Sequence, residues 1–520
     1  MSLFGTRAVS SMWLLVLSLL VLPLQYTQAA QILALVPLAA KSHWNVLDTV
    51  LQTLVARGHN VTVITPFLKG RSIANYTEVD ISHTLPSGIA MPWENIMGEC
   101  SVANNLPYLN GRHRFTCDIV FGLDEFWNTI RSHKFDLFIT ELLASSCDSY
   151  VSHHLQIPQI LVTASHMNTW YHDTFASHTN PAYVSTFHSG FATPSNFVQR
   201  FMNFYDYLYS HLVYKWVDRE ATKIGRKYFG PDVPDADTVM KNTSLVFING
   251  HFTVDLPKPV LPNFVDIGGI HLVPPKPLPQ DIKQFIDESP NGVIYFTFGS
   301  TVKMDTAPLH IQKAFVEGLS GISHRVLWKY ESATLGQLPD NVMIRKWFPQ
   351  RDILNYSKVD LFISHGGMAG VYEAIDSGIP VLGIPLFFDQ KHNIANVVHW
   401  GAGKMLDYNT LTNETLVEAI NEMIYNRAKY RKNAMELSKR FKDRPRTPKQ
   451  EIVYWTEYVI KHKGAHHLKS AALKLNRFQY FLLDIIFLLF FALTTIALFV
   501  YIATKSITHK LSTLSKHKRE

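Results

Sequence analysis

The chain has 520 residues, of which 47% are hydrophobic and 18% are charged. This length exceeds one ordinary domain and is sufficient for two sizeable hydrophobic cores. The formal net charge is +7, but residues 505–520 carry +4 and residues 1–30 carry +1, which leaves +2 for the rest of the chain and excludes a nucleic-acid-binding protein. Three cysteines are too few for a disulfide scaffold.

Residues 1–30 have the pattern of a secretory signal peptide. They contain one charge, Arg7, which is followed by the apolar run WLLVLSLLVLPL and by the small-residue end TQAA. This pattern predicts cleavage after Ala29 or Ala30 and a secretory route for the rest of the chain. The alternative is a retained N-terminal anchor.

Residues 31–255 are predicted to form the first α/β domain. The apolar strand QILALVPLA is followed by a helix over residues 42–56, by a glycine C-cap and by the strand NVTVITP. Two further buried strands, at residues 135–140 and in PQILVTA, continue the pattern. Strands that alternate with helices in this way are typical of a doubly wound parallel sheet.

The segment from about residue 165 to residue 240 is rich in aromatic side chains, with YDYLYSHLVYKW at its centre, and is predicted to be helical. These aromatic side chains are expected either to line an apolar pocket for an acceptor molecule or to pack a helical subdomain.

Cysteines and glycosylation sequons are consistent with a secreted body. At most one disulfide is expected, and we assign it to Cys100 and Cys117, which leaves Cys147 unpaired. Some sequons are expected to be unused, because the first of them opens a predicted buried strand. The five sequons lie at Asn60, Asn75, Asn242, Asn355 and Asn413.

Seven prolines between residues 256 and 280 indicate a linker between two domains. Residues 281–445 then repeat the α/β pattern. Their predicted strands are GVIYFTFGS, RVLWKY, NVMIRKW, VDLFISH and PVLGIPL, with helices between them.

The run from Trp347 to Gln390 has the features of a nucleotide pocket. Its strand LFIS ends at the turn HGG (365–367), after which a helix begins. A glycine-rich turn that opens a helix presents free N–H groups and the positive end of the helix dipole, which suits a pyrophosphate. Trp347 offers a flat face for a base, and Glu373 can accept hydrogen bonds from ribose hydroxyls.

In order and spacing this run resembles the signature of the UDP-glycosyltransferases. A tryptophan stands first, HGG follows, a glutamate lies eight residues after His365, and Asp-Gln ends the run. One position departs from the family, since Ala369 stands where many relatives have asparagine; this puts donor affinity, rather than donor class, in question.

The resemblance implies a set of donor-binding residues. Trp347 would stack on uracil and Gln350 would hold the base mainly through its backbone. Glu373 would bind the ribose, and Asp389 with Gln390 would bind the transferred sugar. The diphosphate would be contacted by Ser300, in the turn that ends YFTFGS, and by His365, Gly367 and the Gly370 amide.

The same resemblance implies the GT-B architecture, in which two doubly wound, Rossmann-like domains face each other across a cleft. Residues 446–477 resemble the family's C-terminal helices, which pack back across the domains and lead to the membrane.

Residues 478–504 are predicted to form a single transmembrane helix, because residues 485–503 contain no charge. The basic tail at 505–520 is then cytosolic by the positive-inside rule, which makes the chain a type I membrane protein. The last residues, KHKRE, resemble a retrieval signal for the endoplasmic reticulum; the alternative is a basic flank of the span.

Transfer of a sugar to a hydroxyl with inversion needs a general base. The candidate is His43 in KSHWNV, at the carboxyl end of the first strand, where such sheets bind ligands. It resembles the family's catalytic histidine, which is also followed by tryptophan. A carboxylate would fix the imidazole tautomer. The family pattern places that acid at Glu141, where many relatives have aspartate, and Asp148 is its rival.

No metal and no cofactor are expected. Asp235-Ala236-Asp237 has the DxD spelling by which other sugar-nucleotide enzymes hold a divalent ion, but it lies in the loop PDVPDADT and not beside a strand end. The glycine turn and the helix dipole can carry the phosphate charge instead.

The sequence therefore predicts an inverting UDP-glycosyltransferase of the endoplasmic reticulum membrane with luminal catalytic domains, a detoxification enzyme. UDP-glucose is the expected donor, because the chain looks most like arthropod members of the family, and UDP-glucuronate is the alternative. The acceptors are expected to be small lipophilic molecules. A second hypothesis is a catalytically lapsed relative that binds ligands or partners another transferase. Self-association or association with a relative is also considered.

Overall fold

The computed structural model describes residues 29–517, apart from residues 37, 86–90, 95–110, 112–113, 144–145 and 333–337. Three predictions fall outside the described residues: the signal peptide as far as residue 28, Cys100, and the last three residues of the tail.

The first sheet has seven parallel strands in the order β3-β2-β1-β5-β6-β7-β8. The strand order changes direction between β1 and β5, so the carboxyl ends of these two strands lie side by side, with Leu35 opposite Thr140. Open α/β sheets bind ligands at such a point. The strands are β1 (Gln31–Leu35), β2 (Asn60–Thr65), β3 (Tyr76–Asp80), β5 (Leu137–Glu141), β6 (Gln159–Thr163), β7 (Leu245–Ile248) and β8 (Phe264–Asp266).

The second sheet has six parallel strands in the order β12-β11-β9-β13-β14-β15. Its order changes direction between β9 and β13, which brings the turns after these strands together. The predicted doubly wound class is therefore confirmed for both sheets. The strands are β9 (Val293–Thr297), β11 (Arg325–Lys329), β12 (Val342–Arg345), β13 (Val359–Ser364), β14 (Val381–Gly383) and β15 (Gly403–Met405).

Helices cover both sheets, and a short parallel pair, β4 (Met91–Pro92) with β10 (Val302–Lys303), joins the two halves. The helices of the first half are α2 (Lys41–Arg57), α5 (Asp124–Ser132), α6 (Ser149–Leu155), α7 (Thr169–Thr174), α8 (Phe197–Phe229), α9 (Ala236–Met240) and α10 (Phe252–Asp255). Those of the second half are α11 (Gln280–Asp287), α12 (Leu309–Ser320), α13 (Gln350–Leu354), α14 (Met368–Ser377), α15 (Gln390–His399), α16 (Asn413–Tyr425) and α17 (Arg427–Lys442).

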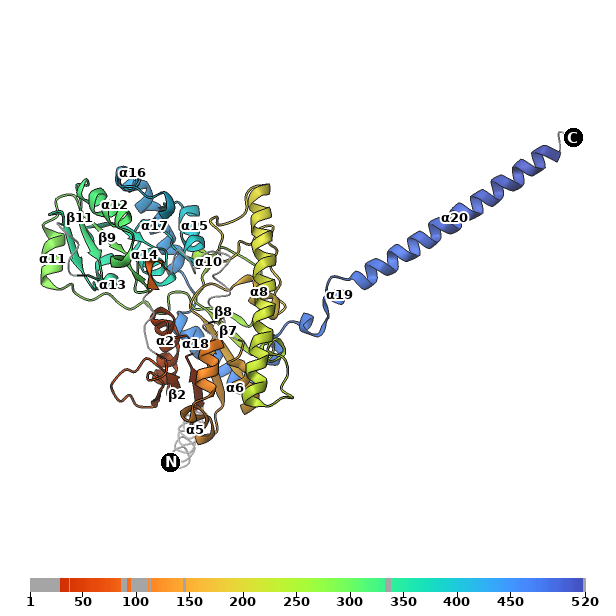
Figure 1. Cartoon of the computed structure of the whole chain (residues 1–520), viewed down its shortest axis with the longest axis horizontal. Coiled ribbons are helices and arrows are strands. Elements are labelled where there is room, and N and C mark those ends of the chain that lie inside the picture. Colours follow the sequence, from red (N-terminus) through yellow and green to blue (C-terminus); the bar gives the residue numbers. More distant parts are fainter. Residues whose placement is uncertain are drawn as a thin grey trace, which may run out of the picture.

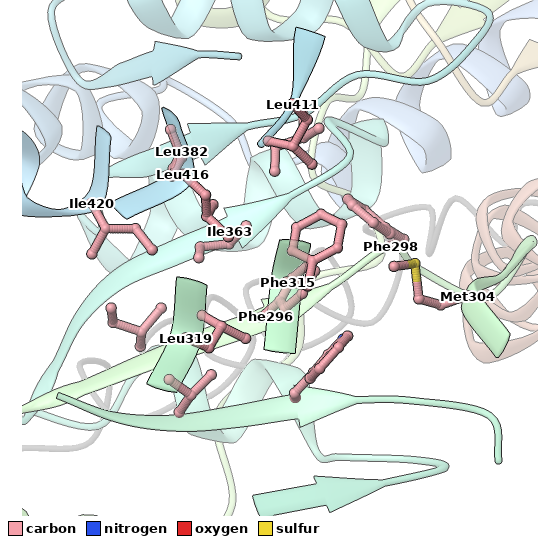
Figure 2. Packing of buried hydrophobic residues seen from close by; sticks show 14 of the residues in the cluster. Phe296, Phe298, Met304, Phe315, Leu319, Ile363, Leu382, Leu411, Leu416 and Ile420 are labelled. Atoms are coloured by element: carbon pink, nitrogen blue, oxygen red, sulfur yellow. The ribbon is translucent and has the colours of Figure 1, made fainter. Parts of the chain in front are cut away.

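One core of the second sheet lies between its strands and the helices α12 and α16 (Figure 2). Phe296 of β9 packs against Phe315 of α12 with ring centroids 5.0 Å apart, and Leu416 and Ile420 of α16 belong to the same cluster. Aromatic and branched apolar side chains on one face of each element bury large areas, which fixes the helices on the sheet.

The chain returns to the first half after α17. Ile452 and Val459 of α18 (Pro448–Lys461) are buried in the core of the first sheet. Glu457 of the same helix pairs with Arg57 of α2, with 2.7 Å between Arg57 Nε and Glu457 Oε1. Helix α18 therefore docks the chain onto the first half after it leaves the second.

The C-terminal part projects away from the body as α19 (Arg477–Tyr480) and α20 (Leu483–His517) (Figure 1). Among the described residues, one helix is long and apolar enough to cross a membrane, over Leu483–Ser515. The predicted span at 478–504 differs at both ends. Leu482 has a left-handed φ of 53°, which separates α19 from α20, and the polar residues after 504 continue the helix.

The disulfide prediction is wrong. Cys117 is bonded to Cys147, with Cα atoms 6.5 Å apart, and both side chains are buried. The loop between β5 and α6 carries Cys147 onto the helical segment that holds Cys117. Spacing in the sequence contains no information about this approach, because the two cysteines are brought together by the packing of the sheet.

Candidate active site

His43 and Glu141 meet at the carboxyl edge of the first sheet. His43 is the third residue of α2, which follows β1, and Glu141 is the last residue of β5. Since β1 and β5 are neighbours, the His43 Nδ1 atom contacts the Glu141 Oε1 atom. A carboxylate on Nδ1 favours the tautomer that donates from Nδ1 and leaves the Nε2 lone pair as a proton acceptor.

The pKa of His43 is raised above its usual value. Burial acts to lower this pKa, but the charge of Glu141, its hydrogen bond and the charge of Asp389 together outweigh the burial. The result is a stronger base than a free imidazole, and the contribution of Asp389 shows that the second half of the chain approaches this histidine.

The rival acid, Asp148, has a different neighbour. It is the residue before α6, and its Oδ1 atom lies 3.3 Å from Cys117 Sγ. Its side chain is buried beside the disulfide. The structure therefore brings Glu141 to His43 and brings Asp148 to the cystine.

Two glycine turns enclose the His365 ring in the second half. Gly299 has a φ of 76°, and a Cβ atom there would lie 2.7 Å from His365 Cε1. A Cβ atom on Gly367 would lie 2.6 Å from His365 Nε2. Both positions therefore need glycine, because any side chain would clash with the ring. Ser300, the next residue after Gly299, is exposed.

Burial, with a smaller contribution from the charge of Lys329, lowers the pKa of His365 to about 4, so the ring is neutral at physiological pH. Its Nδ1 atom is buried and has no hydrogen-bond partner among the described residues. Gly370 is the third residue of α14, where backbone N–H groups have no partner within the helix. The turn thus offers a set of donors to an anion.

Gln350 and Glu373 contact each other beside an exposed tryptophan. Gln350 Nε2 donates to Glu373 Oε2, and Tyr295 Oη donates to Gln350 Oε1 at 3.4 Å. The Gln350 N–H donates to the Phe348 carbonyl at 2.9 Å. Burial raises the pKa of Glu373, against the opposing hydrogen bond from Gln350. The side chain of Trp347 is 72% exposed, so its ring is open to a planar ligand.

Asp389 and Gln390 lie at the start of α15, after Phe388 with a φ of 53°. Burial raises the pKa of Asp389, although the hydrogen bond from Asn393 and the charge of His43 oppose this effect. Gln390 is buried, and its Oε1 atom accepts from the backbone N–H groups of Leu386 at 2.9 Å and Phe387 at 3.2 Å. The side-chain carbonyl of Gln390 therefore holds the loop before α15 in place.

Sequence reasoning missed Asn393. Its Nδ2 atom donates to Asp389 Oδ2 at 2.9 Å and to the Gly366 carbonyl at 3.0 Å. This side chain therefore ties the Asp389 loop to the HGG turn. Its position four residues after Asp389 on a helix was the available signal, because residues at this spacing lie on one face.

The DxD residues are paired with cations of the protein. Asp235 precedes α9, and its Oδ1 atom lies 2.8 Å from Arg226 Nη2. Asp237 lies inside α9 rather than in the predicted loop, and it pairs with Lys241 one turn later. Both of these ion pairs lie within the first half, whereas the two glycine turns belong to the second.

A second group missed by sequence reasoning lies where α10 and α15 meet. The possible ligand atoms of His166, Asp255 and His392 lie within 4.8 Å of one another. Lys258 Nζ lies 2.6 Å from Asp255 Oδ2, so an ammonium already balances the carboxylate. No sequence signal links these residues, because they come from three separate segments.

The sequons occupy different surroundings. Asn75, Asn242 and Asn355 are exposed, whereas Asn60 and Asn413 are partly covered. Asn60 and Asn75 also line a hollow of about 430 Å³ at the edge of the first sheet where β2 begins, opposite to the carboxyl edge that holds His43.

Comparison with known proteins gives one consistent result. The profile of the family described as UDP-glucoronosyl and UDP-glucosyl transferase matches residues 31–520. "UDP-glucosyltransferase 2" of Dactylopius coccus is 39% identical over 512 residues, which are 97% of this chain and 98% of that protein. "UDP-glucuronosyltransferase 2C1" of Oryctolagus cuniculus is 32% identical over 89% of this chain and 95% of its own length.

Solved structures with the same fold include the glycotransferase of kitacinnamycin, with a TM-score of 0.57, 18% identity, and coverage of 82% of this chain and 99% of that chain. The calicheamicin glycosyltransferase CalG4 has a TM-score of 0.52 and 16% identity over 83% of this chain and 98% of its own. These similarities establish the GT-B fold.

Proposed function

Because the chain belongs to the UDP-glucoronosyl and UDP-glucosyl transferase family, whose members move a sugar from a UDP-sugar, we propose that it transfers glucose to a hydroxyl of small lipophilic acceptors with inversion. The observation that carries this proposal is the position of His43. It contacts Glu141 in the first half, and the charge of Asp389, from a loop of the second half, also acts on it.

In the proposed reaction the acceptor hydroxyl binds at His43 Nε2. The imidazole takes the hydroxyl proton while the acceptor oxygen forms a bond to the anomeric carbon of the sugar. The bond from that carbon to the phosphate oxygen breaks, and UDP leaves with the electron pair. Glu141 stabilises the imidazolium that forms. Attack on the face opposite to UDP inverts the configuration.

The second half is proposed to hold UDP. The donors around Gly299, Ser300, His365, Gly367 and the Gly370 amide suit the diphosphate, because the neutral His365 can donate and the α14 N-terminus favours negative charge. Glu373, held by Gln350, is assigned to the ribose hydroxyls. Asp389 and Gln390 are assigned to the sugar, with the Gln390 Oε1 atom and Asn393 fixing their loop.

Replacing Trp347 by alanine is expected to weaken UDP binding, because base stacking on an aromatic ring contributes about 1–3 kcal/mol. The corresponding rise in Kd is roughly 5- to 150-fold. Titration calorimetry with UDP measures it. Trp347→Phe is the matched control, since it keeps an aromatic face and should retain most of the affinity. An unchanged Kd in Trp347→Ala would remove the stacking assignment.

Donor identity is tested by assay of the purified full chain with labelled UDP-glucose and labelled UDP-glucuronate against a pooled library of phenols and steroids. We expect glucose transfer, because the relatives at 39% identity include a UDP-glucosyltransferase. Preference for UDP-glucuronate would favour the alternative donor, which a relative at 32% identity supports. No UDP release with any acceptor would favour a ligand-binding or partner role.

Transfer is expected to persist in excess EDTA. The DxD carboxylates are already paired with Arg226 and Lys241, and the phosphate charge can be met by the donors of the two glycine turns. The measurement is the rate of UDP release before and after chelation. A loss of activity that added Mg²⁺ restores would show instead that a metal takes part.

The proposal includes a type I location in the endoplasmic reticulum membrane. It is supported by α20, by the exposed sequons and by the Cys117–Cys147 disulfide, since disulfides persist in oxidising compartments. In sealed microsomes the body is expected to be protease-resistant while a tag on the tail is cleaved, and after detergent lysis the glycans of the body should be sensitive to endoglycosidase H. Cleavage of the body in sealed vesicles would contradict this orientation.

A further inference from the structure

Helix α8 has an inverted distribution of apolar side chains. Between Phe197 and Leu212 its buried residues are Asn203 and Ser210, which are polar, and the apolar buried residues Tyr214, Val217 and Ala221 come only after them. A surface helix of a soluble protein normally directs its large apolar residues inward. The first five turns of α8 direct them outward instead: the exposed residues there are Phe197, Val198, Phe201, Met202, Phe204, Tyr205, Leu208, Leu212 and Trp216.

These nine residues, which we call the α8 apolar face, form a continuous stripe. Phe201, Tyr205, Leu208 and Leu212 follow one another at intervals of three or four residues, the spacing of one side of a helix. They are 62%, 65%, 45% and 68% exposed. Contiguous exposed apolar surface of this kind is typical of a binding face for a protein or a membrane.

The helix packs onto the body mainly through its opposite side, although Trp216 at the end of the α8 apolar face also lies under the Arg114 guanidinium, which is 5.0 Å from its ring centroid. On the opposite side, Gly225 lies so close to Tyr150 that a Cβ atom would be 2.3 Å from its ring. The Asn203 Nδ2 atom donates to the carbonyls of Pro181 at 2.7 Å and Val184 at 2.8 Å. The buried side therefore holds α8 in place, and the apolar face is available for another partner.

The membrane helix leaves the body beside α8. The ring of Tyr480 in α19 lies 4.2 Å from that of His178, and His178 Nδ1 lies 2.7 Å from Asp173 Oδ1. Asp173 Oδ2 in turn accepts from Tyr207 Oη of α8 at 3.0 Å. Two residues separate α19 from α20. Figure 1 shows α20 projecting from the side of the body on which α8 lies.

Charge along α8 also fits a bilayer surface. From Phe197 to Leu212 the charged residues are Arg200 and Asp206, and the Asp206 Oδ1 atom lies 3.2 Å from His188 Nδ1. After Leu212 the exposed residues include Lys215, Arg219 and Lys223. Exposed cations beside an apolar helix face suit a position in the lipid interface, where they can meet headgroup phosphates.

We propose that the α8 apolar face is inserted into the surface of the same lipid bilayer that α20 spans. This rests on the proposed membrane anchoring of α20. A second insertion point next to the anchor fixes the orientation of the body on the membrane, with the first domain against the lipid from which lipophilic acceptors would arrive.

The test uses the full chain with Cys100→Ser, which leaves the Cys117–Cys147 disulfide, in nanodiscs of phosphatidylcholine and phosphatidylserine that hold one chain each. An environment-sensitive fluorophore is attached through Phe201→Cys, Leu208→Cys or Leu212→Cys. Tyr425→Cys, at a site 90% exposed at the end of α16, is the solvent control. Phe490→Cys in α20 reports on the anchor separately.

We expect labels on the α8 apolar face to be quenched by lipids with a nitroxide near the headgroup, and to be several-fold less sensitive to aqueous iodide than the Tyr425→Cys label. If the labels on the α8 apolar face were as sensitive to iodide as the Tyr425→Cys label, while the Phe490→Cys label was quenched by lipid, the α8 proposal alone would be overturned. An iodide-accessible Phe490→Cys label would overturn the anchoring as well. Shielding from iodide without lipid quenching would show that another part of the chain covers the face, and would also overturn the proposal.

Discussion

His43→Ala is expected to lower kcat for sugar transfer by about 10²- to 10⁴-fold, the range over which a positioned general base contributes. The Nε2 atom is the group that would take the acceptor proton, because Nδ1 is held by Glu141. The measurement is UDP release and product formation with saturating donor and acceptor. The His43 side chain is 22% exposed, so its replacement by alanine should not leave a large buried cavity.

Binding of UDP serves as the control for this variant. The proposed UDP contacts belong to the second half of the chain, so the Kd for UDP should be unchanged in His43→Ala. Retention of near-normal kcat would exclude His43 as the base. A parallel loss of UDP affinity would indicate damage to the fold and would require His43→Gln, which keeps a hydrogen-bonding side chain.

Glu141→Gln is expected to have the second largest effect, a loss of about 10²- to 10⁴-fold in kcat, because an amide can leave the histidine in the wrong tautomer and cannot stabilise the imidazolium. Glu141 acts through His43 and is a positioning residue. Asp148→Asn is the matched comparison, since this acid lies beside Cys117 and should cost far less activity. Full activity in Glu141→Gln, with loss in Asp148→Asn, would reverse the assignment.

The pH profile separates this role from a merely structural one. The neutral imidazole is the active form, so kcat/KM should fall as pH drops through the raised pKa of His43 and should level off above it. In Glu141→Gln the main causes of the raised pKa are lost while the burial remains, so the acid limb should move to lower pH. An unmoved limb would mean that Glu141 does not act on His43.

Much of the fold could be predicted because its signals are local. The runs QILALVPLA and VDLFISH are apolar enough for buried parallel strands, and Gly366 and Gly367 after the second run indicate a turn at the carboxyl edge. The partners of the single disulfide could not be predicted, since the approach of Cys117 to Cys147 depends on tertiary packing. The exact limits of α20 depend on the left-handed backbone at Leu482 and on a polar extension that hydropathy does not detect.

Within the site, motif and spacing indicated the residues but not their mutual support. His365 and Glu373 were assigned from the run that begins at Trp347, while the close approach of Gly299 to His365 required two separate strands, β9 and β13, to be placed side by side. The hydrogen bonds of Asn393 and the outward apolar face of α8 were missed for the same reason: each depends on which side of a helix faces the body.

The stereochemistry of the product tests the central claim most directly. With UDP-α-glucose as donor and an acceptor found in the library assay, NMR of the isolated product gives the configuration at the anomeric carbon. Base-assisted attack at His43 on the face opposite to UDP predicts a β-glucoside, formed by the wild type and lost in His43→Ala. An α-glucoside, or a β-glucoside formed equally fast by His43→Ala, would contradict it.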